Sequence, residues 1–205
     1  MAPDPAPRRA TRQIGIVLFD GVEELDAVGP WEVLAYWTQH HREDGWTVSC
    51  LSSDGGAVTA AKGLVLGAHH AFDAAPPLDV LLHPGGHGKE KLLGDAAYLD
   101  WVRGQRAAVP LMTSVCTGAL VYAAGGLLSG RRATTHWAFL DRLRELEPTV
   151  DAQAHARYVD DGDLITSAGV SAGIDMALHL VARLAGADRA RQVRHAIQYG
   201  PAAPV

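Results

Sequence analysis

Hydrophobic positions fall into short, nearly continuous runs separated by amphipathic stretches. Four of these runs are expected to be strands buried on both faces of a sheet: Ile14–Phe19, Trp46–Leu51, Asp79–His83 and Pro110–Val115. Apolar positions at helical spacing predict helices over residues 29–41, 98–107, 119–126, 136–146, 173–184 and 187–198. Strands that alternate with helices in this way predict an α/β fold built on a largely parallel sheet.

Four further segments carry weaker strand signals. Leu64–Leu66 is expected in a short hairpin, and Ala133–Thr135 in a short strand ahead of a helix. Arg157–Val159 and Leu164–Thr166 flank the turn Asp160-Asp161-Gly162-Asp163, which predicts a second hairpin.

Length and composition indicate one globular domain. The chain has 205 residues, of which 48% are hydrophobic and 20% charged, and this balance excludes a disordered protein. No repeat or linker divides it. Residues 13–198 are therefore expected to form a single domain between loosely held tails at 1–12 and 199–205.

Charge, apolar segments and cysteine content indicate which kinds of partner and which cellular compartment to expect. Lys and Arg number 18 against 23 Asp and Glu, a net charge of −5, and no basic run is present to hold a phosphate backbone, so no nucleic-acid partner is expected. No segment is apolar for long enough to span a bilayer. The N-terminus lacks the apolar region of a signal peptide, and two cysteines are too few for a disulfide framework. We therefore expect a cytoplasmic protein with no membrane partner.

Cys116 is the residue that points most directly to chemistry. It lies between the strand ending at Val115 and a predicted helix, with Gly118 two positions later. A strand–turn–helix of this kind lifts a nucleophile clear of the sheet, and the next N–H can bind an oxyanion. The helix N-terminus favours a thiolate. The alternative is a small buried hydrophobic residue, which is the commonest role of a free cysteine and the one expected for Cys50.

Two loops are expected to face the same crevice as Cys116. Ligands of open α/β sheets bind beyond the carboxyl ends of the strands, and His83-Pro84-Gly85-Gly86-His87 follows such a strand. An N–H of this loop is a candidate second oxyanion donor. Glu23, Glu24 and Asp26 follow the first strand. One of them is a candidate acid beside the thiol. The alternative is that all three only interact with the dipole at the start of a helix.

Histidines do not form a metal-ligand pattern. The chain has 10, none of them in an HExxH sequence. His83 and His87 flank the Pro-Gly-Gly bend, but no cysteine or carboxylate completes a ligand set, so neither a metal nor a cofactor is expected. His136 opens a predicted helix, and its position alone leaves its role open.

Five motifs in order resemble the ThiJ/PfpI superfamily, relatives of the class I glutamine amidotransferases. The resemblance runs from about Gln13 to Gln198. Its motifs are Gly21-Val-Glu-Glu-Leu-Asp26 with Gly29-Pro30, Pro84-Gly85-Gly86, Ser114-Val-Cys116-Thr117-Gly118, Ala133-Thr-Thr-His136-Trp137 and Thr166-Ser-Ala-Gly169-Val-Ser-Ala-Gly173-Ile-Asp175. It implies a flavodoxin-like three-layer sandwich with helices on both faces of a mostly parallel sheet.

The resemblance also implies roles for the matching residues. Cys116 corresponds to the reactive thiol, and Asp26 to the acid that hydrogen-bonds it. The backbone N–H groups of Gly86 and Thr117 correspond to the oxyanion site, and His136 to a histidine beside the cysteine.

Departures from the superfamily's patterns distinguish its branches. PfpI-type proteases carry histidine directly after the nucleophile, whereas this chain has Thr117. Thr117 with Asp26 and Gly29-Pro30 resembles the isonitrile hydratase branch. That resemblance implies cysteine-dependent hydration of a small-molecule isonitrile to a formamide through a thioimidate, with Cys116, Asp26 and Thr117 acting together in a homodimer. His87 stands where this branch is expected to carry a threonine-like residue, which adds a titratable group near the substrate.

A non-catalytic function is the alternative. The same motifs resemble the sensor half of AraC-type transcription regulators, in which a DNA-binding domain follows. Only seven residues lie beyond Gln198, so no such domain is expected here. The alternative is therefore a ligand-binding domain, or a redox sensor in which Cys116 is oxidised.

Overall fold

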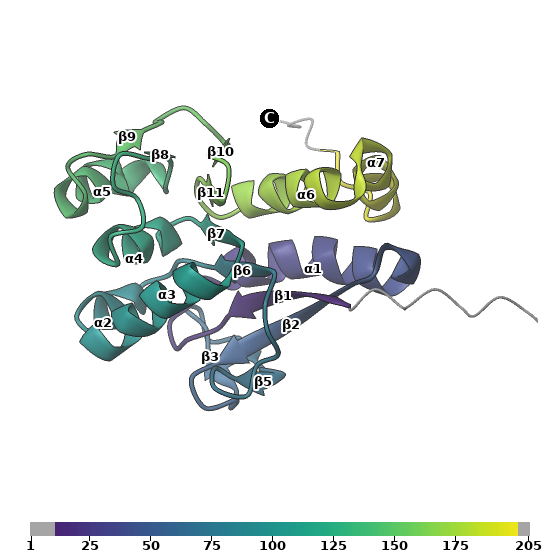
Figure 1. Cartoon of the computed structure of the whole chain (residues 1–205), viewed down its shortest axis with the longest axis horizontal. Helices are drawn as coiled ribbons and strands as arrows, with labels where there is room; N and C mark the ends of the chain where they lie inside the picture. Colours follow the sequence, from purple (N-terminus) through teal and green to yellow (C-terminus); the bar gives the residue numbers. More distant parts are fainter. Residues whose placement is uncertain (1–10, 201–205) are drawn as a thin grey trace, which may run out of the picture.

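A seven-stranded sheet forms the centre of the molecule in a computed structural model that describes residues 11–200 (Figure 1). Its order is β10-β11-β7-β6-β1-β2-β5, and every neighbouring pair is parallel except β10–β11. The strands of this sheet are β1 (Arg12–Val17), β2 (Trp46–Ser52), β5 (His70–Ala71), β6 (Val80–His83), β7 (Leu111–Val115), β10 (Tyr158–Asp160) and β11 (Leu164–Ser167). The predicted parallel sheet is confirmed.

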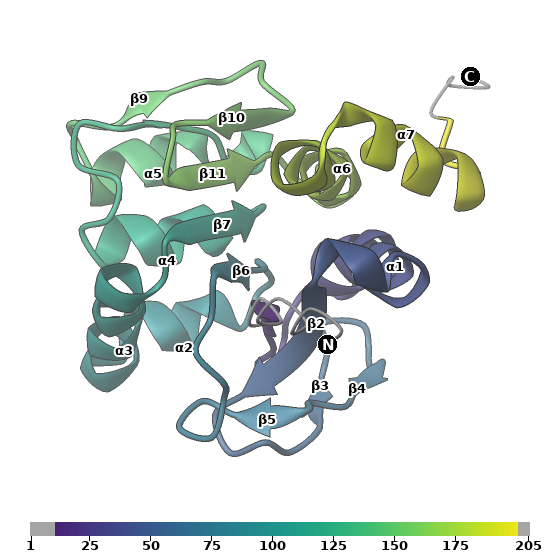
Figure 2. The ribbon, with the colours of Figure 1, turned by 45° about the vertical axis from the view of Figure 1, so that its right-hand side comes forward.

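Helices cover both faces of the sheet, as Figures 1 and 2 show. One layer contains α1 (Glu24–His40), α6 (Ala172–Ala185) and α7 (Ala187–Ala196). The other contains α2 (Lys89–Leu93), α3 (Ala96–Ala108), α4 (Gly118–Ala124) and α5 (Leu140–Leu146). This arrangement confirms the flavodoxin-like sandwich. Among residues 11–200, no helix is long and apolar enough to cross a membrane.

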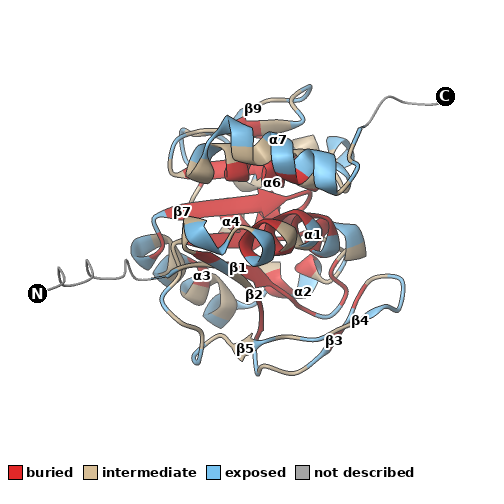
Figure 3. Ribbon diagram, turned by 90° about the vertical axis from the view of Figure 1, so that its right-hand side faces the viewer, coloured by how far each residue is buried: buried red, intermediate tan, exposed pale blue. Residues whose placement is uncertain are grey.

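The apolar runs of the sequence are the buried strands (Figure 3). Every residue of β6 and β7 is buried, as expected for strands covered on both faces. The predicted hairpins also form: β3 (Val58–Thr59) pairs with β4 (Val65–Leu66), and β10 pairs with β11. A third small pair joins β8 (Arg132–Ala133) to β9 (Asp151–Ala152).

The first helix begins five residues earlier than predicted. Placing Pro30 in the first turn gave a start at Gly29, but α1 begins at Glu24 and contains the proline. Glu24 and Asp26 occupy its first turn, where the charge of Glu24 interacts favourably with the helix dipole. Asp26 is therefore held by a helix rather than by a loop.

The segment after Arg132 also differs from the expectation. The strand predicted at Ala133–Thr135 ends at Ala133, because the next backbone N–H, that of Thr134, donates to the Thr166 side chain at 2.8 Å. The helix predicted at 136–146 starts as a single 3-10 turn, Trp137–Phe139, capped by His136. Only residues 140–146 are α-helical.

Two residues that were expected in the loosely held tails, Arg12 and Tyr199, make defined contacts with the domain. Arg12 belongs to β1: its N–H donates to the carbonyl of Gly45 at 2.9 Å, and its guanidinium lies 4.1 Å from the Trp46 ring centroid. Tyr199 donates its hydroxyl to Asp175 at 3.1 Å. Residues 1–10 and 201–205 of the expected tails lie outside the described part of the chain.

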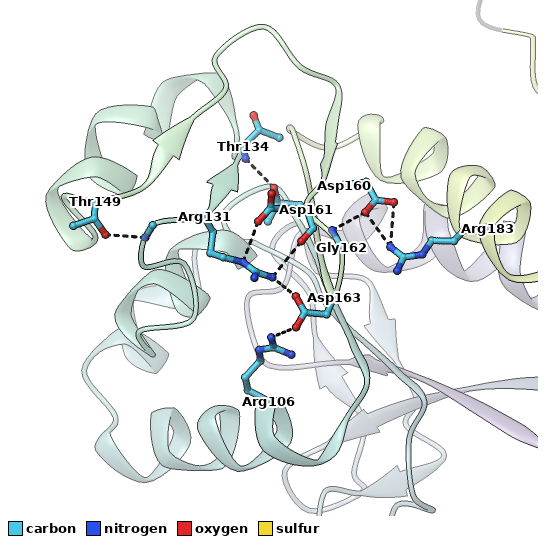
Figure 4. A network of polar contacts seen from close by, with 11 residues as sticks. Arg106, Arg131, Thr134, Thr149, Asp160, Asp161, Gly162, Asp163 and Arg183 are labelled. Carbon is cyan, nitrogen blue, oxygen red and sulfur yellow. Dashed lines mark hydrogen bonds and ion pairs between the residues drawn. The ribbon is translucent and has the colours of Figure 1, made fainter.

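An ion-pair network ties the β10–β11 turn to the helices (Figure 4). The Asp163 carboxylate pairs with Arg106 of α3 and with Arg131, which precedes β8. Asp160 pairs with Arg183 of α6 at 2.9 Å. The turn is thereby fastened to both helical layers. The hydrogen bonds from Arg106 and then from Arg131 lower the pKa of Asp163 to about 2.

Replacing Asp163 by asparagine is expected to lower the Tm at pH 7. The side chain is 45% exposed, so its two ion pairs are expected to contribute about 1 kcal/mol, or roughly 2–4 °C. Because folding depresses this pKa, the contribution exists above pH 4 and is lost as the pH falls through about 2. Thermal melts at pH 7 and pH 2 test this, with exposed Asp73→Asn as the control. An equal Tm difference at both pH values would contradict it.

Candidate active site

Three loops meet beyond the carboxyl ends of the central strands. The chain runs from β1 to β2 on one side, and β6 lies on the other, so the topology switches direction between β1 and β6. This is where ligands of open α/β sheets bind. The segment from Gly21 to Asp26 follows β1, Pro84–Gly86 follows β6, and Cys116 follows β7.

Cys116 forms a strained elbow directly after β7. Its φ is +55°, in the left-handed region that L-residues avoid. Backbone bonds hold it there: its N–H approaches the carbonyls of Ser167 at 3.1 Å and Ala168 at 3.3 Å. The hydroxyl of Thr135 donates to its carbonyl at 2.8 Å. The predicted strand–turn–helix geometry is present, and α4 starts at Gly118.

The Pro84–Gly86 loop joins Asp26 to Thr117. The N–H of Gly85 donates to Asp26 Oδ2 at 2.9 Å, and the N–H of Gly86 donates to Thr117 Oγ1 at 3.0 Å. The loop thus connects the acid of α1 to the residue after the cysteine. It also means that the Gly86 N–H, expected to be a free oxyanion donor, is already engaged by a side chain.

Only glycine fits at two positions of this loop. A Cβ on Gly85 would lie 2.4 Å from Thr117 Oγ1 and 2.5 Å from Thr117 N. Gly86 has a φ of +134°, and a Cβ there would lie 2.3 Å from the Gly21 carbonyl oxygen. The two glycines let the backbone reach the side chains of both neighbouring loops.

Asp26 is a buried carboxyl with one uncommitted oxygen. Its side chain is inaccessible to solvent, and Oδ1 has no hydrogen-bond partner among the described residues. Burial raises its pKa to about 7, and the negative charge of Glu23 adds to this rise. The Gly85 hydrogen bond, the Cys116 thiol and the charge of Lys62 oppose it. A pKa near neutrality suits an acid and base that exchanges protons in each cycle.

The Cys116 thiol is also kept protonated by its surroundings. Burial, and after it the charge of Asp26, raise its pKa to about 12. Hydrogen bonding from the backbone N–H groups of Thr117 and Val170 lowers this pKa and so acts in the opposite direction. Val170 has a φ of +47°, an unusual conformation for a β-branched residue.

The two candidate histidines lie at the edge of the site. His136 packs its ring on Gly169, beside Val170, and is half-buried. His87 is exposed, and its Nε2 lies against Gly21. Within residues 11–200, no hydrogen bond joins either ring to Cys116, and no group of three or more possible metal ligands occurs.

Three contributors to the site were not identified from the sequence. Thr135 lies inside a motif that drew attention to His136 instead, although its hydroxyl is the group that holds Cys116. Val170 contributes its backbone, which leaves little trace in residue type. Lys62, between β3 and β4, pairs with Glu23 and Glu24. Of the three acids, Asp26 alone is fully buried.

This geometry agrees with a sequence match over most of the chain. The profile of the DJ-1/PfpI family matches residues 12–183. The chain belongs to the DJ-1/PfpI family. Its sequence is 44% identical to the isonitrile hydratase of Pseudomonas putida over 193 residues, which cover 94% of this chain and 80% of that protein.

Other DJ-1/PfpI relatives show the breadth of the family. The transcriptional regulator CdhR of Pseudomonas aeruginosa is 31% identical over 92% of this chain, which spans 55% of that regulator. A THiJ/PfpI family protein from Pseudomonas syringae superposes with a TM-score of 0.84 at 30% identity, covering all of this chain and 84% of that one.

Substituting Gly85 by alanine is expected to destabilise the protein by about 1–3 kcal/mol, because the new methyl group would overlap Thr117. Gly104→Ala is the matched control: that glycine lies within α3 with nothing near its Cβ position. It is expected to stabilise the helix by up to about 1 kcal/mol. Urea unfolding measures both, and equal effects would refute the close approach at Gly85.

Asp26→Asn is expected to be more stable than the wild type above pH 7 and nearly equal to it near pH 4. Folding raises the Asp26 pKa from 3.8 to about 7, so the favourable, protonated form is lost as the pH rises through this window. The neutral amide avoids this loss, which amounts to up to about 4 kcal/mol. Unfolding free energies at pH 4, 6 and 8 test this. A stability difference that is independent of pH would rule out a raised pKa.

Proposed function

We propose that this protein hydrates a small-molecule isonitrile to an N-substituted formamide. The observation that carries the proposal is the pair formed by a buried thiol and a buried carboxyl whose pKa lies near neutrality. The 44% identity to an isonitrile hydratase over 94% of the chain supports it.

In the first step, Cys116 is the nucleophile and Asp26 transfers the proton. The carboxylate takes the thiol proton as the sulfur attacks the isonitrile carbon, and the proton is delivered to the same carbon. R–N≡C and the thiol together give the thioimidate R–N=CH–S. The transfer conserves atoms and charge, and it divides one difficult addition into two steps. The Thr117 and Val170 N–H groups near the sulfur stabilise its developing charge.

In the second step, water adds to the thioimidate carbon. Asp26 accepts a proton from the water, and the nitrogen gains one, giving R–NH–CH(OH)–S. Collapse expels the thiol, which regains its proton, and leaves R–NH–CHO. Thr117 is placed to orient this water: its Oγ1 already accepts the Gly86 N–H, and its own proton has no acceptor among residues 11–200.

The environment of Cys116 argues against redox sensing. A sensing thiol has a low pKa. Burial raises the pKa of Cys116 to about 12 instead. The buried environment of Cys116 therefore favours a thiol that loses its proton only as it reacts.

Cys116→Ala is expected to abolish formamide formation from cyclohexyl isocyanide, because no thioimidate can form. Asp26→Asn is expected to lower kcat about 100-fold or more, because the amide transfers no proton. Thr117→Ser is expected to retain more activity than Thr117→Val, since the serine keeps the hydroxyl. Chromatographic measurement of the formamide tests all four variants.

Cys50→Ala is the matched control. Cys50 is also buried with a pKa raised by burial to about 12, but it lies in β2, outside the site. Its loss is expected to leave turnover unchanged. Formamide formation that survives in Cys116→Ala would overturn the mechanism. Absence of product with the wild type would favour ligand sensing, the function class suggested by the similarity to regulators.

A further inference from the structure

A buried imidazole lies at the base of the Pro84–Gly86 loop. His83, the last residue of β6, is fully buried. Its Nδ1 lies 2.7 Å from the carbonyl oxygen of Pro84, and its Nε2 lies 2.7 Å from the hydroxyl oxygen of Tyr98 in α3. Both nitrogens of the ring therefore have a partner, and one of these partners is the candidate active-site loop.

These partners fix the tautomer of the ring. A carbonyl oxygen only accepts hydrogen bonds, so His83 Nδ1 carries the proton and donates it to Pro84. Nε2 is then the acceptor, and the Tyr98 hydroxyl is its donor. Burial lowers the pKa of His83 to about 4, so the ring is neutral at physiological pH.

The Pro84 carbonyl and the Gly85 N–H belong to the same planar peptide unit. Because this unit is rigid, fixing the direction of the carbonyl fixes that of the N–H. His83 holds the carbonyl, and the N–H donates to Asp26 Oδ2 at 2.9 Å. No backbone N–H among the described residues donates to the Pro84 oxygen. The imidazole is therefore the group that orients this peptide.

We propose that His83, held by Tyr98, is a positioning residue that orients the Pro84–Gly85 peptide so that its N–H hydrogen-bonds Asp26. The chain of contacts runs from Tyr98 in α3 through His83 and the Pro84–Gly85 peptide to Asp26 in α1. The helices α3 and α1 belong to opposite layers (Figure 2). Its consequence for turnover rests on the proposed hydratase function, whereas its consequence for Asp26 does not.

The expected signature is a change in the ionisation of Asp26. The Gly85 hydrogen bond lowers the pKa of this carboxyl, so a misoriented peptide raises it. The charge of Asp26 in turn raises the pKa of the Cys116 thiol. The rate of Cys116 alkylation therefore has an inflection at the pH where Asp26 ionises. Cys116, Glu23 and Lys62, the other ionisable groups acting on Asp26, are unchanged in the variants below.

Tyr98→Phe and Tyr122→Phe form a matched pair for the test. Both tyrosine rings lie within 6 Å of the His83 ring, at 5.9 and 5.8 Å between centroids. The Tyr122 hydroxyl donates to the carbonyl of Thr113 at 2.8 Å and not to His83. Each substitution removes one buried hydroxyl from the same cluster, so their costs in stability are comparable.

Alkylation of Cys116 by iodoacetamide is followed by mass spectrometry from pH 5 to pH 10 in a Cys50→Ser background. Tyr98→Phe is expected to move the inflection upward by about 0.5–1 pH unit and to lower kcat about 10- to 100-fold. Its KM is expected to stay near the wild-type value. Tyr122→Phe is expected to change none of these. Equal behaviour of the two variants would overturn the proposal.

His83→Asn and His83→Gln provide the second test. The amide nitrogen of asparagine reaches the place of Nδ1 and that of glutamine the place of Nε2, so only asparagine can still donate to Pro84. His83→Asn is therefore expected to keep an inflection closer to the wild-type value than His83→Gln. The reverse order would overturn the proposal. A wild type that forms no formamide would remove the hydratase function, while the alkylation profiles would still decide the role of His83.

Discussion

The peptide plane between Pro84 and Gly85 is the element on which the rest of the site depends. Its N–H is the group that anchors the Asp26 carboxyl, and the next N–H anchors Thr117. Both bonds require a backbone that comes closer to its neighbours than a Cβ allows: Thr117 lies against Gly85, and the backbone of Gly21 lies against Gly86. The two glycines thus join the segments that follow three parallel strands, because they connect the acid of α1 to the residue after the cysteine.

Contacts from the sheet hold Cys116 in a strained backbone conformation. Cys116 adopts a φ of +55°, and the bonds that hold it come from the ends of two other segments, β11 and the loop after β8. Each of these segments is itself fixed by neighbouring strands, so the local cost is balanced by cooperative packing. The strained conformation of Cys116 is therefore stabilised by contacts from segments that the buried sheet holds in place.

Residue pattern predicts elements and chemistry here, but not the directions of backbone groups. The apolar runs from Ile14 and from Pro110 predict β1 and β7, and the position of Cys116 after a buried strand predicts its elbow. The predicted start of α1 was wrong because a proline fits the first turn of a helix better than its interior. The sequence does not show the packing that tolerates Pro30 inside the helix. The engaged N–H of Gly86 depends on the position of Thr117, 31 residues away in sequence, and no local pattern encodes that contact.

In the proposed hydration, one desolvated environment acts on both groups that exchange the proton. The substrate carbon would receive a sulfur and a proton, and the pair formed by Cys116 and Asp26 can hold both. Burial keeps that proton on Cys116, and burial also raises the pKa of Asp26 to about 7, which allows this carboxyl to pass the proton on. The same desolvation therefore raises the pKa of both partners in the proposed proton transfer.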